Sequence, residues 1–147
     1  MSLARTVFGG FMLLFLGASP LSAPAAAATP PSPEALQAAK YLTPQEVIQR
    51  QKRGERIVIG DVRKEAAFNT RRIMGAKSLP AKDLEVWAPK LSPKEALVLY
   101  CACPHDEASI IAAYQLQNRY KAKNVYVLKG GINEWIAKGY PFDYRQP

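Results

Sequence analysis

The chain has 147 residues, of which 48% are hydrophobic, so it is long enough for one domain with a substantial core. It carries 20 Lys and Arg residues against 12 Asp and Glu residues, which gives a formal net charge of +8. The basic residues are dispersed and form no stripe interleaved with aromatic residues, which argues against nucleic acid as a partner. The composition favours a globular protein with a solvated basic surface.

Residues 1–28 have the pattern of a secretory signal peptide. Arg5 supplies the positive charge, the run from Val7 to Leu16 supplies the apolar core, and small residues follow up to Ala28. The apolar run is short for a membrane span. We therefore expect a periplasmic or secreted protein. The alternative is a protein anchored in the inner membrane by an uncleaved segment, the only case in which we expect membrane contact.

Residues 29–40 contain three prolines and are interpreted as a linker, which leaves residues 41–147 as one domain. Within that domain, strand and helix patterns alternate at short spacing, which predicts an α/β fold with a central parallel β-sheet. The expected strands are residues 56–60, 76–79, 97–101 and 125–128. The expected helices are Pro44 to Lys52, 65–69 and 83–88. They are followed by a helix opened by Ser109 and a final helix containing Ile132, Trp135 and Ile136.

Cys101 is the first candidate functional residue. It ends the apolar run 97–100, and a tight loop leads from it to Ser109, which is expected to cap the following helix. Ligands of open α/β sheets bind beyond the carboxyl ends of the strands, where N–H groups and the helix dipole favour anions. Cys101 is therefore a candidate nucleophile, with a buried structural cysteine as the alternative.

Cys103 is a possible second thiol, and its spacing leaves three roles open. It could be a spectator, a resolving thiol, or a disulfide partner of Cys101, in which case the small C-x-C ring would be strained and easily reduced. Cys101, Cys103 and His105 could also supply three metal ligands. Because His105 is the only histidine and no fourth ligand is evident, we predict neither a metal nor any other cofactor.

Four ordered pieces of sequence resemble the rhodanese-like family over about Tyr41 to Tyr144. They are Ile59-Gly60-Asp61-Val62-Arg63, then Ile73-Met74-Gly75-Ala76 with Leu79-Pro80, then Val98-Leu99-Tyr100-Cys101, and finally Val125-Tyr126-Val127-Leu128-Lys129-Gly130-Gly131 with Trp135, Gly139, Tyr140 and Pro141. The resemblance implies a central parallel sheet with helices on both faces. It also implies that Cys101 carries sulfane sulfur as a persulfide, held by N–H groups of the loop that follows.

The resemblance further implies a set of site residues around this cysteine. Asp61 and Arg63, at the end of an earlier strand, are expected to hydrogen-bond the loop backbone around that strand end, which is a structural role. The substrate-binding loop would consist of Ala102, Cys103, Pro104, His105, Asp106, Glu107, Ala108 and Ser109.

The loop departs from the family pattern in its charge. A typical rhodanese loop has an arginine five residues after the cysteine, where this chain has Asp106 followed by Glu107. These carboxylates could face the pocket or could face solvent and complement the helix N-terminus. Two further departures are Arg71-Arg72 in place of the usual Gly-His pair, and a loop that is longer than the common one if Ser109 is the helix cap. The acidic loop disfavours a phosphatase and makes thiosulfate an unfavourable donor.

The sequence thus predicts sulfur transfer through a Cys101 persulfide, from a small sulfane-sulfur donor to a thiol acceptor. Two alternatives remain open at this point. One is a non-catalytic binding module that holds a protein partner with its acidic loop, and the other is a thiol–disulfide redox protein that uses Cys101 and Cys103.

Overall fold

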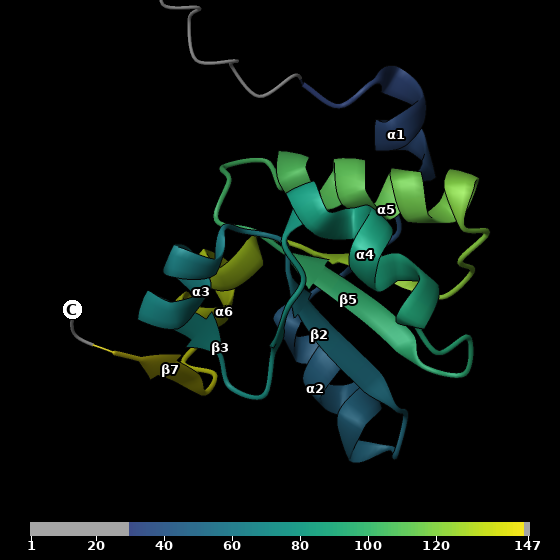
Figure 1. Ribbon diagram of the computed structural model, residues 1–147. Coiled ribbons are helices and arrows are strands. Elements are labelled where there is room, and N and C mark those ends of the chain that lie inside the picture. The colour runs from purple at the N-terminus through teal and green to yellow at the C-terminus, as the bar shows by residue number, and fades with distance from the viewer. Residues whose placement is uncertain (1–29, 146–147) are drawn as a thin grey trace, which may run out of the picture.

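Five parallel strands form the central sheet of the computed structural model, which describes residues 30–145 (Figure 1). The strands are β1 (Tyr41–Leu42), β2 (Ile57–Asp61), β4 (Lys77–Ser78), β5 (Ala96–Tyr100) and β6 (Val125–Leu128). Their spatial order is β1-β6-β5-β2-β4, with every neighbouring pair parallel. β5 is therefore the middle strand, and its carboxyl end is flanked by β2 and β6. The α/β class with a parallel sheet, predicted from the sequence, is confirmed.

Helices cover both faces of this sheet (Figure 1). One face carries α1 (Pro33–Ala38), α4 (Leu84–Trp87) and α5 (Glu107–Arg119), together with the 3-10 turns η1 (Ala81–Asp83) and η2 (Ala88–Lys90). The other face carries α2 (Pro44–Lys52) and α6 (Gly131–Ala137), with α3 (Glu65–Thr70) beside α6. This arrangement is the one that the family resemblance implied.

Each face of the sheet packs into its own core. Along β5, Leu97 and Leu99 face the core beneath α5, whereas Val98 and Tyr100 face the core beneath α2 and α6. All four side chains are at most 5% exposed. A strand covered on both faces needs apolar residues without alternation, which is the pattern that the sequence shows here.

A second, two-stranded sheet lies at one side of the molecule (Figure 1). It pairs β3 (Arg71–Ile73) with β7 (Phe142–Tyr144) in antiparallel fashion. Its inner residue, Ile73, is fully buried against the second core. Neither strand was expected from the sequence, because both are short and their apolar residues are interrupted by charged ones.

The helix after Cys101 begins earlier than predicted. Asp106, not Ser109, occupies the N-cap position, in a left-handed conformation with φ 60° that aspartate tolerates better than most residues. Ser109 lies instead within the first turn and is fully buried. The loop between Cys101 and α5 therefore spans only residues 102–106, so the expectation of an unusually long loop is wrong.

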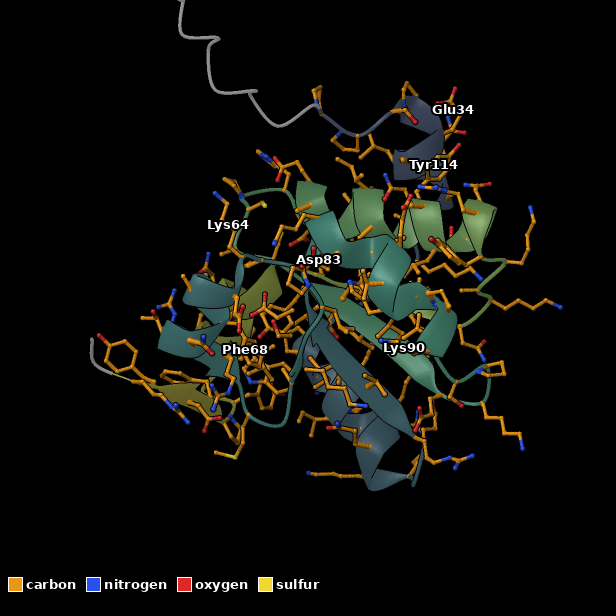
Figure 2. All side chains as sticks on the ribbon, viewed as in Figure 1. Glu34, Lys64, Phe68, Asp83, Lys90 and Tyr114 are labelled. Atoms are coloured by element: carbon orange, nitrogen blue, oxygen red, sulfur yellow. The ribbon has the colours of Figure 1, made fainter. Side chains whose placement is uncertain are left out.

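Part of the expected linker is packed structure. Ser32 caps α1, Pro33 opens it, and Ala35 is only 3% exposed in the core beneath α5. α1 lies against α5, and Figure 2 labels Glu34 on the first helix and Tyr114 on the second. Proline at the first position of a helix favours helix formation, so the proline-rich composition did not exclude this element. The expected signal segment, residues 1–28, lies outside the described residues, and none of the helices within residues 30–145 has the length and apolarity to cross a bilayer.

Candidate functional site

Cys101 directly follows the central strand β5 and is 1% exposed. Its carbonyl oxygen accepts a hydrogen bond of 3.0 Å from the N–H of Ile132, in the first turn of α6. The residue is therefore fixed between the end of the sheet and the start of a helix, beneath the loop 102–106. This is the edge of a parallel sheet at which ligands of α/β proteins bind.

The thiol of Cys101 lies in an environment with opposing effects on its ionisation. Burial raises the pKa of the thiol to about 11, and the neighbouring Cys103 thiol acts in the same direction. The backbone N–H of Cys103 opposes this rise by donating to Sγ at 3.3 Å. The hydroxyl of Ser109 also lowers the pKa, although its oxygen is buried and completes no hydrogen bond of ordinary geometry. At pH 7 such a thiol is almost entirely protonated.

The sequence left open whether Asp106 faces the pocket or the solvent, and in the structure its side chain faces neither. Its side chain is 5% exposed and its Oδ2 accepts a hydrogen bond of 2.9 Å from the N–H of Gly130, in the turn between β6 and α6. Its Oδ1 is buried and has no hydrogen-bond partner among residues 30–145. Burial raises the pKa of this carboxyl. Asp106 thus connects the loop after Cys101 to the turn between β6 and α6 by a hydrogen bond.

Glu107 lies at the first position of α5 and is partly exposed. It accepts a hydrogen bond of 3.3 Å from the N–H of His105, and hydrogen bonding to backbone N–H groups lowers the pKa of its carboxyl. The acidic pair thus divides into a buried carboxyl that holds the loop and a more exposed one at the helix N-terminus.

Gly131 permits the close approach of this turn to Cys101. Its φ is +53°, and a Cβ built on it would collide with the carbonyl oxygen of Cys101. In the sequence, Gly130-Gly131 appeared only as part of the family resemblance, so the contact of this pair with the site was missed. A Gly-Gly pair directly between a strand and a helix was the available signal, because both residues adopt positive φ.

Asp61, Arg63 and Tyr100 form a buried cluster on the other side of β5. Arg63 binds the carboxylate of the fully buried Asp61 through Nε at 2.9 Å and Nη2 at 2.6 Å, and it also donates to the carbonyl oxygen of Arg71. Its guanidinium lies 5.6 Å from the ring centre of Tyr100, whose hydroxyl oxygen accepts the N–H of Ile73. Burial, together with the adjacent Asp61, raises the pKa of Tyr100. These contacts hold in place the carboxyl end of β5, which directly precedes Cys101.

Two hollows lie at opposite edges of the sheet. One, of about 640 Å³, borders the loop and is lined among others by Tyr41, His105, Asp106, Lys129 and Lys138. The other, of about 570 Å³, lies at the amino ends of the strands, with Leu97, Tyr120 and Val125 in its lining. The residues lining these two hollows do not include Cys101, whose thiol lies beneath the loop.

The candidate metal ligands do not converge. Among residues 30–145, no three His, Cys, Asp or Glu side chains are placed to hold one ion. The His105 ring is exposed and lies 3.3 Å from a carboxylate oxygen of Glu107, whereas Cys101 is buried.

Comparison with known families identifies the fold. Residues 43–138 match the Rhodanese-like domain. The chain belongs to the rhodanese-like family. No curated protein sequence matches it.

Solved structures of other rhodanese-like domains agree with this assignment. The Alr3790 protein from Anabaena sp. is 30% identical, with a TM-score of 0.63 over 70% of this chain and 80% of that one. A thiosulfate sulfurtransferase from Pseudomonas aeruginosa is 26% identical, with a TM-score of 0.65 over 77% of this chain but only 22% of the longer enzyme.

A third structure is RPA3614 from Rhodopseudomonas palustris, described as a protein of unknown function and possible tyrosine phosphatase. It is 28% identical, with a TM-score of 0.62 over 75% of this chain and 89% of that one. Membership of the rhodanese-like family gives the chain a sulfurtransferase-type or related function in general terms.

Proposed function

We propose that this rhodanese-like protein transfers sulfane sulfur through a persulfide on Cys101. The observation that carries the proposal is the placement of Sγ at the carboxyl end of the middle strand, in contact with the Cys103 N–H and next to the amino end of α5. N–H groups and a helix dipole at this place stabilise the negative charge of a persulfide.

The reaction has two displacement steps. In the first, the Cys101 thiolate attacks the outer sulfur of a donor persulfide, and the donor leaves as its own thiolate. In the second, an acceptor thiolate attacks the outer sulfur of the Cys101 persulfide, and Cys101 leaves as thiolate. The donor is a small sulfane-sulfur compound and the acceptor is a thiol, and neither step requires a metal or another cofactor.

Phosphate-ester hydrolysis fits this loop less well than sulfur transfer does. A phosphatase must stabilise an anionic transition state with cationic groups or many N–H donors, yet the chain has no Lys or Arg between Cys101 and Arg119. The residues that close this same loop, Asp106 at the N-cap of α5 and Glu107 at its first position, are both acidic. The possible phosphatase named for the Rhodopseudomonas structure is therefore not the function that we propose here.

The test is mass spectrometry of the full chain after incubation with one equivalent of a low-molecular-weight organic persulfide. We expect the Cys103→Ser variant to gain one sulfur atom on the peptide that contains Cys101, and the Cys101→Ser variant to gain none. Absence of any gain in Cys103→Ser would support a binding module. A redox pair would be supported if neither variant gains sulfur and the wild-type protein loses two hydrogens when it is treated with a disulfide oxidant.

We also propose that the protein works in the periplasm after removal of its N-terminal segment. The support is the sequence pattern of residues 1–28, with Arg5 before an apolar run and an alanine-rich end. N-terminal sequencing of the protein recovered from cell fractions tests this. A periplasmic protein that lacks the alanine-rich segment ending at Ala28 is expected, whereas an intact Met1 in the membrane fraction would make the segment an anchor.

A further inference from the structure

The second thiol of the loop lies beside the proposed sulfur carrier. The N–H of Cys103 contacts Sγ of Cys101 at 3.3 Å, and the Cys103 thiol lies close enough to influence ionisation of the Cys101 thiol. Both cysteines are free, and Cys103 is partly exposed whereas Cys101 is buried. A persulfide formed on Cys101 would therefore meet a thiol of the same loop before any acceptor arrives.

Resting on the proposed sulfur transfer, we propose that Cys103 reduces the Cys101 persulfide within the loop and releases the carried sulfur as hydrosulfide. The Cys103 thiolate attacks Sγ of Cys101, a bond forms between the two cysteine sulfurs, and the bond from Sγ to the outer sulfur breaks. The outer sulfur takes the electron pair and leaves as hydrosulfide. The Cys103 sulfur is oxidised to the disulfide level, Sγ of Cys101 keeps its oxidation level, and the outer sulfane sulfur is reduced to sulfide, so atoms and electrons balance.

Attack at Sγ is favoured over attack at the outer sulfur by the leaving group. Attack at the outer sulfur would expel the Cys101 thiolate, whose conjugate thiol has a pKa raised by burial to about 11. Attack at Sγ expels hydrosulfide, a weaker base than a buried alkyl thiolate. Thiol exchange is faster when the leaving group is the weaker base. Sγ is also the atom that the Cys103 backbone already contacts.

The resulting disulfide between Cys101 and Cys103 is easily reduced. A disulfide between residues two apart closes a small, strained ring, and strained disulfides are the easily reduced ones. An external dithiol would reach the sulfur of the partly exposed Cys103 first, and relief of ring strain offsets the poorer leaving group that this attack expels. Over one cycle, an organic persulfide and a dithiol become a thiol, hydrogen sulfide and a disulfide. The activity therefore needs a dithiol as the reductant that regenerates the two cysteine thiols.

The experiment follows one turnover in the absence of external dithiol. The wild-type chain and Cys103→Ser are each mixed with one equivalent of a cysteine persulfide under nitrogen, and sulfide is trapped with a bimane reagent while the protein is alkylated for mass spectrometry. For the wild type we expect about one sulfide per chain and a peptide that has lost two hydrogens across Cys101 and Cys103. For Cys103→Ser we expect sulfide release to fall at least tenfold and the Cys101 persulfide to remain.

The two variants separate failure of this inference from failure of the proposed function. A wild-type chain that keeps the persulfide on Cys101, or moves it to Cys103, without releasing sulfide overturns the inference while leaving sulfur transfer intact. Equal sulfide release from wild type and Cys103→Ser also overturns it. Absence of sulfur loading in Cys103→Ser overturns the proposed function itself. Cys103→Ala, which removes the hydroxyl as well, checks that serine does not act in place of the thiol.

Discussion

Two opposing influences act on the ionisation of Cys101. Burial of the side chain holds the thiol neutral, whereas the Cys103 N–H and the Ser109 hydroxyl favour the thiolate. Burial dominates, since the pKa rises to about 11. The nucleophile in sulfur transfer is the thiolate, not the thiol, so the small ionised fraction limits the first step near neutral pH.

The reactivity of Cys101 should therefore rise steeply with pH. Below the pKa, the thiolate fraction increases about tenfold per pH unit, so we expect alkylation of Cys101 in Cys103→Ser by iodoacetamide to accelerate in this proportion from pH 6 to 9. Peptide mass spectrometry measures the rate at the single remaining cysteine. Free cysteine serves as the control and should level off near its ordinary pKa of about 8.5. A plateau for Cys101 already at pH 8 would contradict the effect of burial.

Asp106 illustrates how a residue at a functional position can be structural. Its Oδ2 holds the Gly130 N–H, and its φ of 60° is tolerated by Asp and Asn but costs most other residues about 1 kcal/mol. We expect Asp106→Ala to lower the free energy of unfolding by about 2–4 kcal/mol, through the lost hydrogen bond and the backbone strain. Asp106→Asn keeps an acceptor and the preferred conformation, so urea unfolding should show a much smaller loss.

The pH dependence of these variants has a definite sign. Burial raises the folded-state pKa of Asp106 above its ordinary value, so the folded protein binds this proton more tightly than the unfolded chain. Stability contributed by Asp106 therefore falls as the pH rises above about 4. The free energy of unfolding of Asp106→Asn, relative to that of wild type, should thus be higher at pH 7 than at pH 4. Glu107→Gln is the matched control and should show the opposite trend, because the pKa of Glu107 is lowered.

At the scale of elements, the site depends on the contact between α6 and the loop after β5. The Ile132 N–H binds the Cys101 carbonyl oxygen, and Gly131 lies against the same carbonyl without room for a side chain. The start of α6 therefore fixes the backbone of the candidate nucleophile. A small displacement of this helix would move Sγ relative to the N–H groups around it.

Gly131→Ala should disrupt this contact. The new Cβ would collide with the Cys101 carbonyl oxygen, and alanine at φ +53° is strained in addition. We expect a loss of about 2–4 kcal/mol in the free energy of unfolding by urea, together with slower sulfur loading of Cys101. Gly139→Ala is a matched control, because its φ is +74° but no atom lies within 4 Å of the added Cβ. It should lose only about 1 kcal/mol, and equal losses in both variants would contradict a role for the contact.

Local sequence signals predicted most of the elements that place Cys101. α2 begins at Pro44 as expected, after a capping box in which the Glu46 N–H donates to the Thr43 hydroxyl at 3.2 Å. The run 125–128 forms β6 with the predicted bounds. These elements have continuous apolar patterns or a specific cap, which a single sequence reveals directly.

The start of α5 was predicted incorrectly because two residues compete for the cap. Asp and Ser are comparable as helix caps, but Asp106 is held in position by the N–H of Gly130, a residue 24 positions later in the chain. That contact is tertiary and is invisible in the local pattern. The strands β3 and β7 were missed for a similar reason, since each is three residues long and depends on the other for its hydrogen bonds.

At the scale of the whole molecule, the overall charge and the charge of the loop have opposite signs. The net charge of +8 draws small anions toward the protein, but this diffuse attraction is largely screened beyond about 8 Å at physiological ionic strength. An anion that reaches Cys101 meets a loop without any cationic residue and with Glu107 at its partly exposed end. The local arrangement therefore decides which donors react.

We expect thiosulfate to be a poor donor, with Cys101 loaded at least tenfold more slowly than by an uncharged or singly charged organic persulfide. Two charges about 4 Å apart interact by roughly 4 kcal/mol at an effective dielectric near 20, so exchanging a loop cation for an anion outweighs the screened field of the whole protein. Asp106 is too deeply buried to receive an arginine, whereas Ala102 is exposed in the same loop. Ala102→Arg should speed loading by thiosulfate more than tenfold, and the uncharged control Ala102→Gln should not. Rapid loading of the unaltered protein by thiosulfate would mean that Glu107 exerts no effective field at Cys101.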